Sequence, residues 1–327
     1  MQAQLIALDW GTTSLRAYKL AAGGEVLEQR SLASGIMQWP SGPRTVAGQV
    51  CIDGFELAFD EACGDWLDAQ PGLPVIACGM VGSAQGWREA PYCDTPANVA
   101  NLGHSLQIIR SLRGVDVHIV PGVIQRSRLP NVMRGEETQV LGALHSLPDE
   151  AVLIGLPGSH SKWVEVANGC IVHFDTFMTG EIFAVLSDHS ILGRTQQRGT
   201  AFDSLAFDRG VQVALSVDGQ IGPLSTVFSA RSLGLTGELS ASAQADYLSG
   251  LLIGHELTAL ATVQRRRRDT IHLPTVVLIG NSQLCVRYQR ALDACGFARV
   301  SLAEQATERG LWQLAVAAGL LDSTASR

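Results

Sequence analysis

An acidic residue and a turn of small residues lie close to the start of the chain, in an order that suits phosphate binding. The apolar run 5–8 ends at Asp9, and between it and the next alternating run lie Trp10, Gly11, Thr12, Thr13 and Ser14. This order predicts a β-hairpin whose tip offers backbone N–H groups and hydroxyls to a phosphate. Asp9, at the end of the first strand, could hold Mg²⁺, directly or through water, beside the phosphates of ATP. An ordinary hairpin is the alternative, because Asp-x-Gly-Thr is common in turns.

A second turn of this kind follows the apolar run 153–156, with the sequence Pro157-Gly158-Ser159-His160-Ser161-Lys162-Trp163. Gly158 permits the backbone to approach a β- or γ-phosphate closely, and the hydroxyl of Ser159 adds a hydrogen bond. His160 belongs to the same predicted nucleotide-binding turn. The pattern G-x-x-x-x-G-K-[ST] does not occur, which disfavours a P-loop NTPase. A hairpin turn that binds nothing is again the alternative.

Two adjacent acids, Glu136 and Glu137, lie between these turns at the start of a helix predicted over residues 138–147. A carboxylate at this place could accept the proton of a hydroxyl group as its oxygen bonds to phosphorus. Adjacent helical residues point about 100° apart, so we expect only one of the two to be the catalytic base. The alternative is that both only complement the helix dipole.

A loop with side chains suited to a sugar acid follows the strand predicted over residues 73–78. It contains Gln85, Trp87, Arg88 and Glu89. Open α/β sheets bind ligands beyond the carboxyl ends of their strands. A guanidinium suits a carboxylate or sugar oxygens, and an indole ring offers an apolar face to a carbon skeleton. The alternative is a surface ion pair between Arg88 and Glu89.

Strands and helices alternate along the chain, as in an α/β protein. Strands are predicted near residues 5–8, 15–20, 26–31, 73–78, 115–120, 151–156, 164–166, 171–174 and 275–279, and helices near 49–69, 138–147, 181–192, 241–265, 282–295 and 310–320. The strand–turn–strand pattern at the start recurs after about 150 residues. We therefore expect two related lobes with a cleft between them, formed by residues 1–135 and 136–327.

Composition excludes several other classes of protein. The chain has 327 residues, 46% of them apolar, a formal charge of −7 and a pI near 5.6, which argues against nucleic acid or an anionic membrane as the main partner. No apolar run is long enough to span a membrane, and the first residues lack the pattern of a signal peptide, so we expect a cytoplasmic protein. Seven cysteines without a C-x-x-C pair indicate reduced thiols. The four arginines 265–268 are interpreted as the solvated end of a helix.

Four segments together resemble the 2-dehydro-3-deoxygalactonokinase family, within the superfamily of sugar kinases, Hsp70 and actin. They are residues 9–14, 133–139, 156–163 and 177–181, and the resemblance covers nearly the whole chain. It implies a two-lobed ribonuclease H-like fold of the actin/hexokinase type with a central cleft. It also implies Mg²⁺- and ATP-dependent phosphorylation of 2-dehydro-3-deoxy-D-galactonate at the C6 hydroxyl, giving the 6-phosphate and ADP in galactonate catabolism.

The resemblance extends to individual residues. Gly280 and Asn281 match the segment where adenosine approaches the backbone, although Asn replaces the more usual second Gly. Glu136 is favoured as the base because its spacing to Gly142 is nearer that of related kinases. Arg88 and Arg16 are the candidates for the substrate carboxylate, and Arg16 has a competing role beside ATP.

Other functions remain open on the same fold. A kinase for another sugar or sugar acid and a phosphohydrolase are the enzymatic alternatives, because fold alone does not separate them. An ATP-driven binding protein like actin or Hsp70 is disfavoured, since no peptide-binding domain follows the second lobe. The expected partners are a small sugar acid and ATP, with a homodimer left open.

Overall fold

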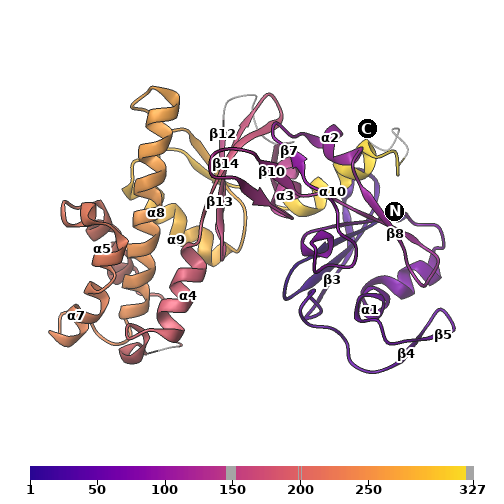
Figure 1. Ribbon diagram of the computed structural model, residues 1–327, viewed down its shortest axis with the longest axis horizontal. Coiled ribbons are helices and arrows are strands. Elements are labelled where there is room, and N and C mark those ends of the chain that lie inside the picture. The colour runs from indigo at the N-terminus through magenta and orange to yellow at the C-terminus, as the bar shows by residue number, and fades with distance from the viewer. Residues whose placement is uncertain (145–151, 198, 200, 322–327) are drawn as a thin grey trace. The chain divides into compact units, whose positions relative to one another are not determined.

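The computed structural model describes residues 1–144, 152–197, 199 and 201–321 and has a mixed α/β fold (Figure 1). Its contacts divide the chain into two compact units. Unit 1 comprises Met1–Glu150, Val166–Phe174 and Glu304–Arg327, and unit 2 comprises Ala151–Glu165 and Asp175–Ala303. Both units are therefore built from segments that are distant in the sequence.

Unit 1 contains a six-stranded sheet in the order β3-β2-β1-β6-β9-β8. The strands are β1 (Leu5–Trp10), β2 (Leu15–Leu20), β3 (Val26–Leu32), β6 (Val75–Cys78), β8 (Gln107–Arg110) and β9 (Asp116–Ile119). The central strand β1 pairs antiparallel with β2 and parallel with β6. Its side chains are buried except that of Asp9, which is partly exposed, because a strand covered on both faces is apolar nearly throughout.

Helices and smaller sheets complete unit 1. They are α1 (Gly54–Ala69), α2 (Val99–Gly103), α3 (Glu136–Leu144), α10 (Ala306–Ala317), the hairpin β4 (Arg44–Val46) and β5 (Gln49–Cys51), and the three-stranded sheet β11 (Asn131–Met133), β10 (Val123–Gln125) and β7 (Cys93–Asp94). The helix predicted from residue 49 begins only at Gly54. Residues 49–51 pair as β5, and Asp53 caps α1 by accepting hydrogen bonds from two backbone N–H groups.

Helix α3 lies in unit 1, whereas the sequence placed it in a C-terminal lobe beginning at residue 136. The physical reason is close packing on α10. A Cβ atom at Gly142 would lie 1.9 Å from the carbonyl oxygen of Ala306, and one at Gly310 would lie 2.0 Å from that of Thr138. Only glycine lets the two backbones approach this closely. The C-terminal helix thus returns to unit 1, and no single cut of the chain separates the units.

Unit 2 contains most of a five-stranded sheet in the order β14-β13-β12-β15-β16, of which the segment Val166–Phe174 is assigned to unit 1. The strands are β12 (Val152–Leu156), β13 (Ser161–Ala167), β14 (Cys170–Phe177), β15 (Thr275–Leu278) and β16 (Val300–Leu302), and the larger helices are α4 (Thr179–His189), α5 (Ser204–Leu215), α7 (Ser229–Leu235), α8 (Gln244–Arg268) and α9 (Ser282–Ala294). Helix α8 contacts α4, α5, α7 and α9 and forms the centre of this unit (Figure 1).

The strands and helices predicted around the two turns are confirmed, with ends that differ by a few residues. Helices α5 and α7 and strand β16 were not predicted. The predicted end of the helix near Pro148 falls outside the described residues. Among the residues that the structure describes, no helix is both long and apolar enough to cross a membrane.

Candidate active site

The first turn is the tip of the β1–β2 hairpin in unit 1. Asp9 and Arg16 face each other across the two strands, and the Arg16 guanidinium donates a hydrogen bond of 3.2 Å to the Asp9 carboxylate. The N–H of Gly11 donates to the carbonyl of Ser14 at 2.9 Å, which closes the turn. Thr12 at the tip is exposed, so it is accessible to a ligand.

The hairpin tip is held from one side by the segment that follows β3. The N–H groups of Ile36 and Met37 donate to the carbonyls of Gly11 and Thr12, at 3.0 and 3.1 Å. A Cβ atom at Gly35 would lie 2.4 Å from the Thr12 carbonyl oxygen, so this close contact requires glycine. The carbonyls of Gly11, Thr12 and Ser14 therefore have hydrogen-bond partners within the protein, which restricts the conformation of the tip.

The start of α3 lies beside the end of β1 because two glycines remove the side chains between them. Gly79 follows β6 with a φ of +92°, and a Cβ atom there would lie 2.7 Å from the carbonyl oxygen of Trp10. A Cβ atom at Gly135 would lie 3.2 Å from the Cα atom of Gly79. This approach places Asp9 and Glu137 near the same buried thiol. Burial raises the pKa of Cys78 well above its usual value, and both carboxylates raise it further.

The two adjacent glutamates differ in their surroundings. Glu137 is fully buried, and its carboxylate accepts hydrogen bonds from the N–H of Gly135 at 2.7 Å and the hydroxyl of Thr138 at 3.1 Å. Burial, together with the neighbouring charge of Glu136, raises the pKa of Glu137 to about 7. Glu136 is partly exposed, and its carboxylate accepts a hydrogen bond from the N–H of Arg134 at 3.0 Å. Glu136 is thus the more accessible of the pair.

The predicted sugar-acid loop follows β6 in the same unit. Gln85, Arg88 and Glu89 are exposed on it. The Trp87 ring instead joins an aromatic cluster, stacked on Phe55 at 6.1 Å and packed edge-on against Trp10 at 5.8 Å. These contacts give Trp87 a packing role in the core of unit 1, beside whatever contact it makes with a substrate.

Arg134 is a residue of unit 1 that the sequence did not single out. Its guanidinium lies 4.4 Å from the centre of the Tyr92 ring, and its Nη2 atom donates to the carbonyl of Ala90 at 2.7 Å. The Nε and Nη1 atoms are buried and have no hydrogen-bond partner within the described part of the chain. Only its position directly before the Gly-Glu-Glu sequence could have drawn attention to it.

The second turn lies in unit 2, between β12 and β13, and the start of α4 packs against it. A Cβ atom at Gly180 would lie 2.3 Å from the carbonyl oxygen of Gly158, and the N–H of Glu181 donates to the carbonyl of Ser159 at 3.0 Å. The side chains of His160 and Glu181 are hydrogen-bonded to each other. Lys162 is buried and donates to the hydroxyl of Thr176 at 2.9 Å, unlike a P-loop lysine.

The predicted adenosine segment lies at the end of β15 in unit 2. Gly280 has a φ of +146°, which an L side chain rarely adopts. Asn281 caps helix α9, since its side-chain oxygen accepts hydrogen bonds from the N–H groups of Gln283 and Leu284, at 3.0 and 3.2 Å. This capping role explains an asparagine where a second glycine was expected.

A cavity of about 540 Å³ brings the second turn and the adenosine segment together in unit 2. Its volume is in the range of small-molecule binding sites. It is bordered by the second turn and by helices α4, α8 and α9. Its lining includes Gly158, Thr179, Gly180, Asn281, Arg287 and Tyr288. The cavity can therefore accept a ligand that contacts both predicted nucleotide-binding segments of this unit.

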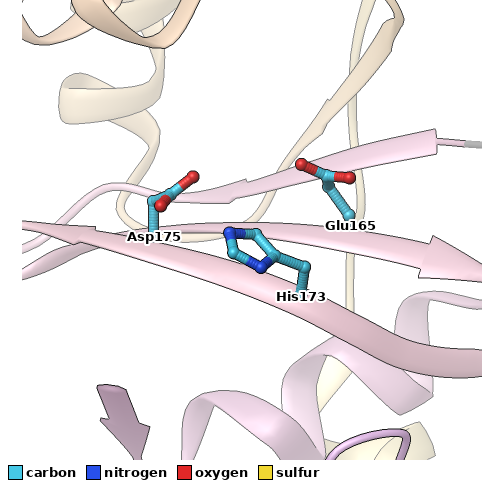
Figure 2. A group of neighbouring side chains, drawn as sticks. All are labelled: Glu165, His173 and Asp175. Carbon is cyan, nitrogen blue, oxygen red and sulfur yellow. The ribbon is translucent and has the colours of Figure 1, made fainter. Parts of the chain in front are cut away.

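One other group of side chains has the geometry of a metal site. Glu165 on β13 and His173 and Asp175 on β14 bring their ligand atoms within 4.8 Å of one another (Figure 2). Arg267, however, donates to the Glu165 carboxylate at 2.8 Å and to that of Asp175 at 2.7 Å. The guanidinium already neutralises these carboxylates, so a cation is not required. Arg267 also shows that the arginine-rich end of α8 is not merely solvated.

Comparisons with known proteins support the resemblance. The model of the 2-keto-3-deoxy-galactonokinase family matches residues 9–314. A protein of Rhizobium meliloti named as a probable 2-dehydro-3-deoxygalactonokinase is 36% identical over 93% of this chain and 94% of its own, and the 2-dehydro-3-deoxygalactonokinase of Escherichia coli is 34% identical over 90% and 91%. A crystal structure of a protein from Sinorhizobium meliloti, described as a putative 2-dehydro-3-deoxygalactonokinase, superposes with a TM-score of 0.80 at 35% identity, covering 96% of this chain and 98% of that one. The chain therefore belongs to the 2-keto-3-deoxy-galactonokinase family of carbohydrate kinases.

Proposed function

We propose that the protein transfers the γ-phosphoryl group of ATP to the C6 hydroxyl of 2-dehydro-3-deoxy-D-galactonate, giving the 6-phosphate and ADP. The observation that carries the proposal is the family match over residues 9–314, which includes every predicted site segment from Asp9 to Asn281. The presence of three carboxylates near the end of β1 and the start of α3 supports it. We also propose that the units are the lobes of a hexokinase-type fold and that the enzyme serves galactonate catabolism in the cytoplasm.

The nucleotide-binding residues are proposed for each unit separately. In unit 2, Asn281 and Gly158 line the cavity. Gly280, which precedes Asn281, is proposed to let adenosine approach the backbone, and residues 158–160 are proposed to offer the backbone and side chains of the second turn to phosphates. In unit 1, residues 11–14 and Arg16 are the proposed phosphate-binding residues, through the hydroxyls of Thr12, Thr13 and Ser14, the Arg16 guanidinium and the N–H groups other than that of Gly11, which closes the turn. The Arg16 side chain of the ion pair with Asp9 is half-exposed, so it can rearrange when an anion binds.

Asp9 is the proposed ligand of Mg²⁺. Carboxylate oxygens are the donors that this ion prefers, and the Asp9 side chain keeps partial exposure at the strand end. Burial raises the pKa of Asp9, while Arg16 opposes that shift. The bound ion would supply charge neutralisation of the phosphates.

Glu136 is the proposed base, because it is partly exposed whereas Glu137 is fully buried with both oxygens hydrogen-bonded. Its carboxylate accepts the C6 hydroxyl proton as the oxygen bonds to phosphorus. Glu137 holds the start of α3 through its bond to Gly135. Gln85, Trp87, Arg88 and Glu89 are the proposed residues for the sugar acid.

The test is incubation of the protein with ATP, Mg²⁺ and a panel of keto-deoxy and aldonic acids, followed by ³¹P NMR of the products. We expect a primary phosphate monoester from 2-dehydro-3-deoxy-D-galactonate, with slower turnover of its C4 epimer. Preference for another acid would change the proposed substrate but leave the proposed phosphoryl transfer from ATP in place. Hydrolysis of the 6-phosphate without any transfer from ATP would instead identify a phosphohydrolase.

A further inference from the structure

A buried glutamate in unit 2 connects several of the segments that border the nucleotide cavity. Glu256, on α8, is 3% exposed. Its carboxylate accepts hydrogen bonds from Trp163 Nε1 on β13 at 2.7 Å and from the hydroxyl of Tyr288 on α9 at 2.8 Å. The side chain of Thr179, the first residue of α4, is a further neighbour of this carboxylate and lowers its pKa.

Each partner of Glu256 belongs to a segment that forms the proposed nucleotide site. Thr179 and Tyr288 line the cavity itself. The Tyr288 hydroxyl is also 2.8 Å from that of Ser161, which directly follows the second turn. Trp163 lies two residues further along β13. One carboxylate thus ties the turn, the start of α4 and helix α9 to the central helix α8.

We propose that Glu256 is a positioning residue of the nucleotide site, which fixes the second turn, the start of α4 and α9 in their binding arrangement. This inference rests on the proposed function, because it requires that the cavity bind ATP. Glu256 acts through Thr179, Tyr288 and Trp163. Its role therefore concerns nucleotide affinity, and the residues proposed for the sugar acid lie in unit 1.

The charge of Glu256 determines the direction of the hydrogen bonds. An ionised carboxylate only accepts, so Trp163 and Tyr288 both donate to it, and the Ser161 hydroxyl then donates to Tyr288. If a neutral side chain at position 256 donates a hydrogen bond to the Tyr288 hydroxyl, the hydrogen bond between Tyr288 and Ser161 reverses its direction. The Tyr288 hydroxyl then donates and the Ser161 hydroxyl accepts. Burial raises the pKa of Glu256 to about 7. Among the groups that bond to it, only Tyr288 is titratable, and burial and Glu256 hold the pKa of that phenol well above its usual value.

The first experiment measures the Kd of Mg²⁺-ATP by calorimetry, without sugar acid, for the wild type and for Glu256→Gln. Glutamine has the same size, but its amide nitrogen cannot accept the hydrogen bond from Tyr288. We expect the Kd to rise by about tenfold, the effect of about 1.4 kcal/mol. The KM for the sugar acid should stay within about twofold, since its proposed residues lie elsewhere.

A matched control is available on the same helix. Gln264 is 1% exposed on α8 and donates to the Glu165 side chain of β13 at 2.8 Å, but it does not line the cavity. Gln264→Leu should lower the unfolding temperature and leave the Kd for ATP unchanged. An equal rise of the Kd in both variants would reduce Glu256 to a general stabilising residue and overturn the proposal.

A second variant keeps the test decisive if Glu256→Gln does not fold. Trp163→Phe removes one donor to Glu256 while retaining an aromatic ring, and it should raise the Kd for ATP by about threefold to tenfold. If the wild-type protein binds ATP and the variants bind it with an unchanged Kd, the positioning role of Glu256 is overturned and the proposed function is not. A wild type that binds no nucleotide would refute the proposed function together with the inference.

Discussion

Asp9 combines partial burial with an ion pair to Arg16 at the place proposed for Mg²⁺. Asp9→Asn should leave the unfolding temperature within a few degrees of the wild type, because asparagine has the same size. We expect kcat to fall by about a hundredfold or more, the scale for loss of a charge-stabilising group. Steady-state kinetics at saturating Mg²⁺ test this, and near-normal turnover there would exclude Asp9 as the ligand.

The neighbouring glutamates can be separated by paired variants. Glu136→Gln should reduce kcat by about a hundredfold while leaving nucleotide affinity unchanged, since it removes a proton acceptor and keeps the shape. Glu137→Gln should cost little activity, because the carboxylate it replaces is enclosed by Gly135 and Thr138. Single-turnover rates of both variants are the measurement. The reverse pattern would make Glu137 the base, and full activity in both would place the base elsewhere.

Substrate charge is expected to be recognised by arginine. Arg88→Ala should raise the KM for the keto acid far more than the KM for ATP, because only one substrate loses a carboxylate contact. Equal effects on both constants would indicate an effect on folding instead. An unchanged KM for the keto acid would mean that another arginine binds the carboxylate. The candidates are then Arg16 and Arg134, whose Nε and Nη1 atoms have no hydrogen-bond partner in the described part of the chain.

At the scale of elements, the start of α9 has two proposed tasks, capping the helix and bordering adenosine. Asn281→Ala should lower the free energy of unfolding by about 1 kcal/mol, because it removes the acceptor for two backbone N–H groups. Asn281→Ser keeps a capping oxygen and should restore most of that loss. Urea unfolding of both variants reports on the capping role, and the Kd for ATP reports on the contact with adenosine. If serine restores stability but not affinity, the asparagine side chain itself contacts the nucleotide.

For the whole molecule, buried carboxyl groups predict how stability depends on pH. The pKa values of Glu137 and Glu256 are both raised to about 7 by burial. Between about pH 4.5 and 7 the unfolded chain therefore loses protons that the folded protein keeps, so stability should fall as the pH rises through this range. Replacing either residue by glutamine should make the slope of the unfolding free energy against pH shallower, by at most about 1.4 kcal/mol per pH unit.

Urea unfolding at pH 5, 6, 7 and 8 is the measurement for this pH dependence, with Asp65→Asn as its control. A hydrogen bond from Arg30 lowers the pKa of Asp65, so the contribution of Asp65 to stability is lost only at a pH more acidic than this range. This control variant should keep the wild-type slope between pH 5 and 8. A slope that stays unchanged in both glutamine variants would contradict the raised pKa values.

The sequence by itself determined the local elements, because apolar periodicity and turn residues act over a few positions. It predicted β1, β2, β12 and β13 with the turns between them, and the family resemblance that the comparisons confirm. It did not predict α5, whose packing on α8 depends on Gly210 and Gly250. A Cβ atom at either of these glycines would lie 2.2 Å or less from a backbone oxygen of the other helix.

The tertiary structure alone decided the environment of each functional side chain. Glu136 and Glu137 are adjacent in the sequence, and only the packing around the start of α3 leaves Glu136 partly exposed and buries Glu137. The Trp87 ring joins an aromatic cluster of the core, and Glu256 forms hydrogen bonds with side chains on two elements that are distant in the sequence, β13 and α9. Burial and partners depend on which segments pack together over long separations, and residue spacing along the chain carries no direct record of that packing.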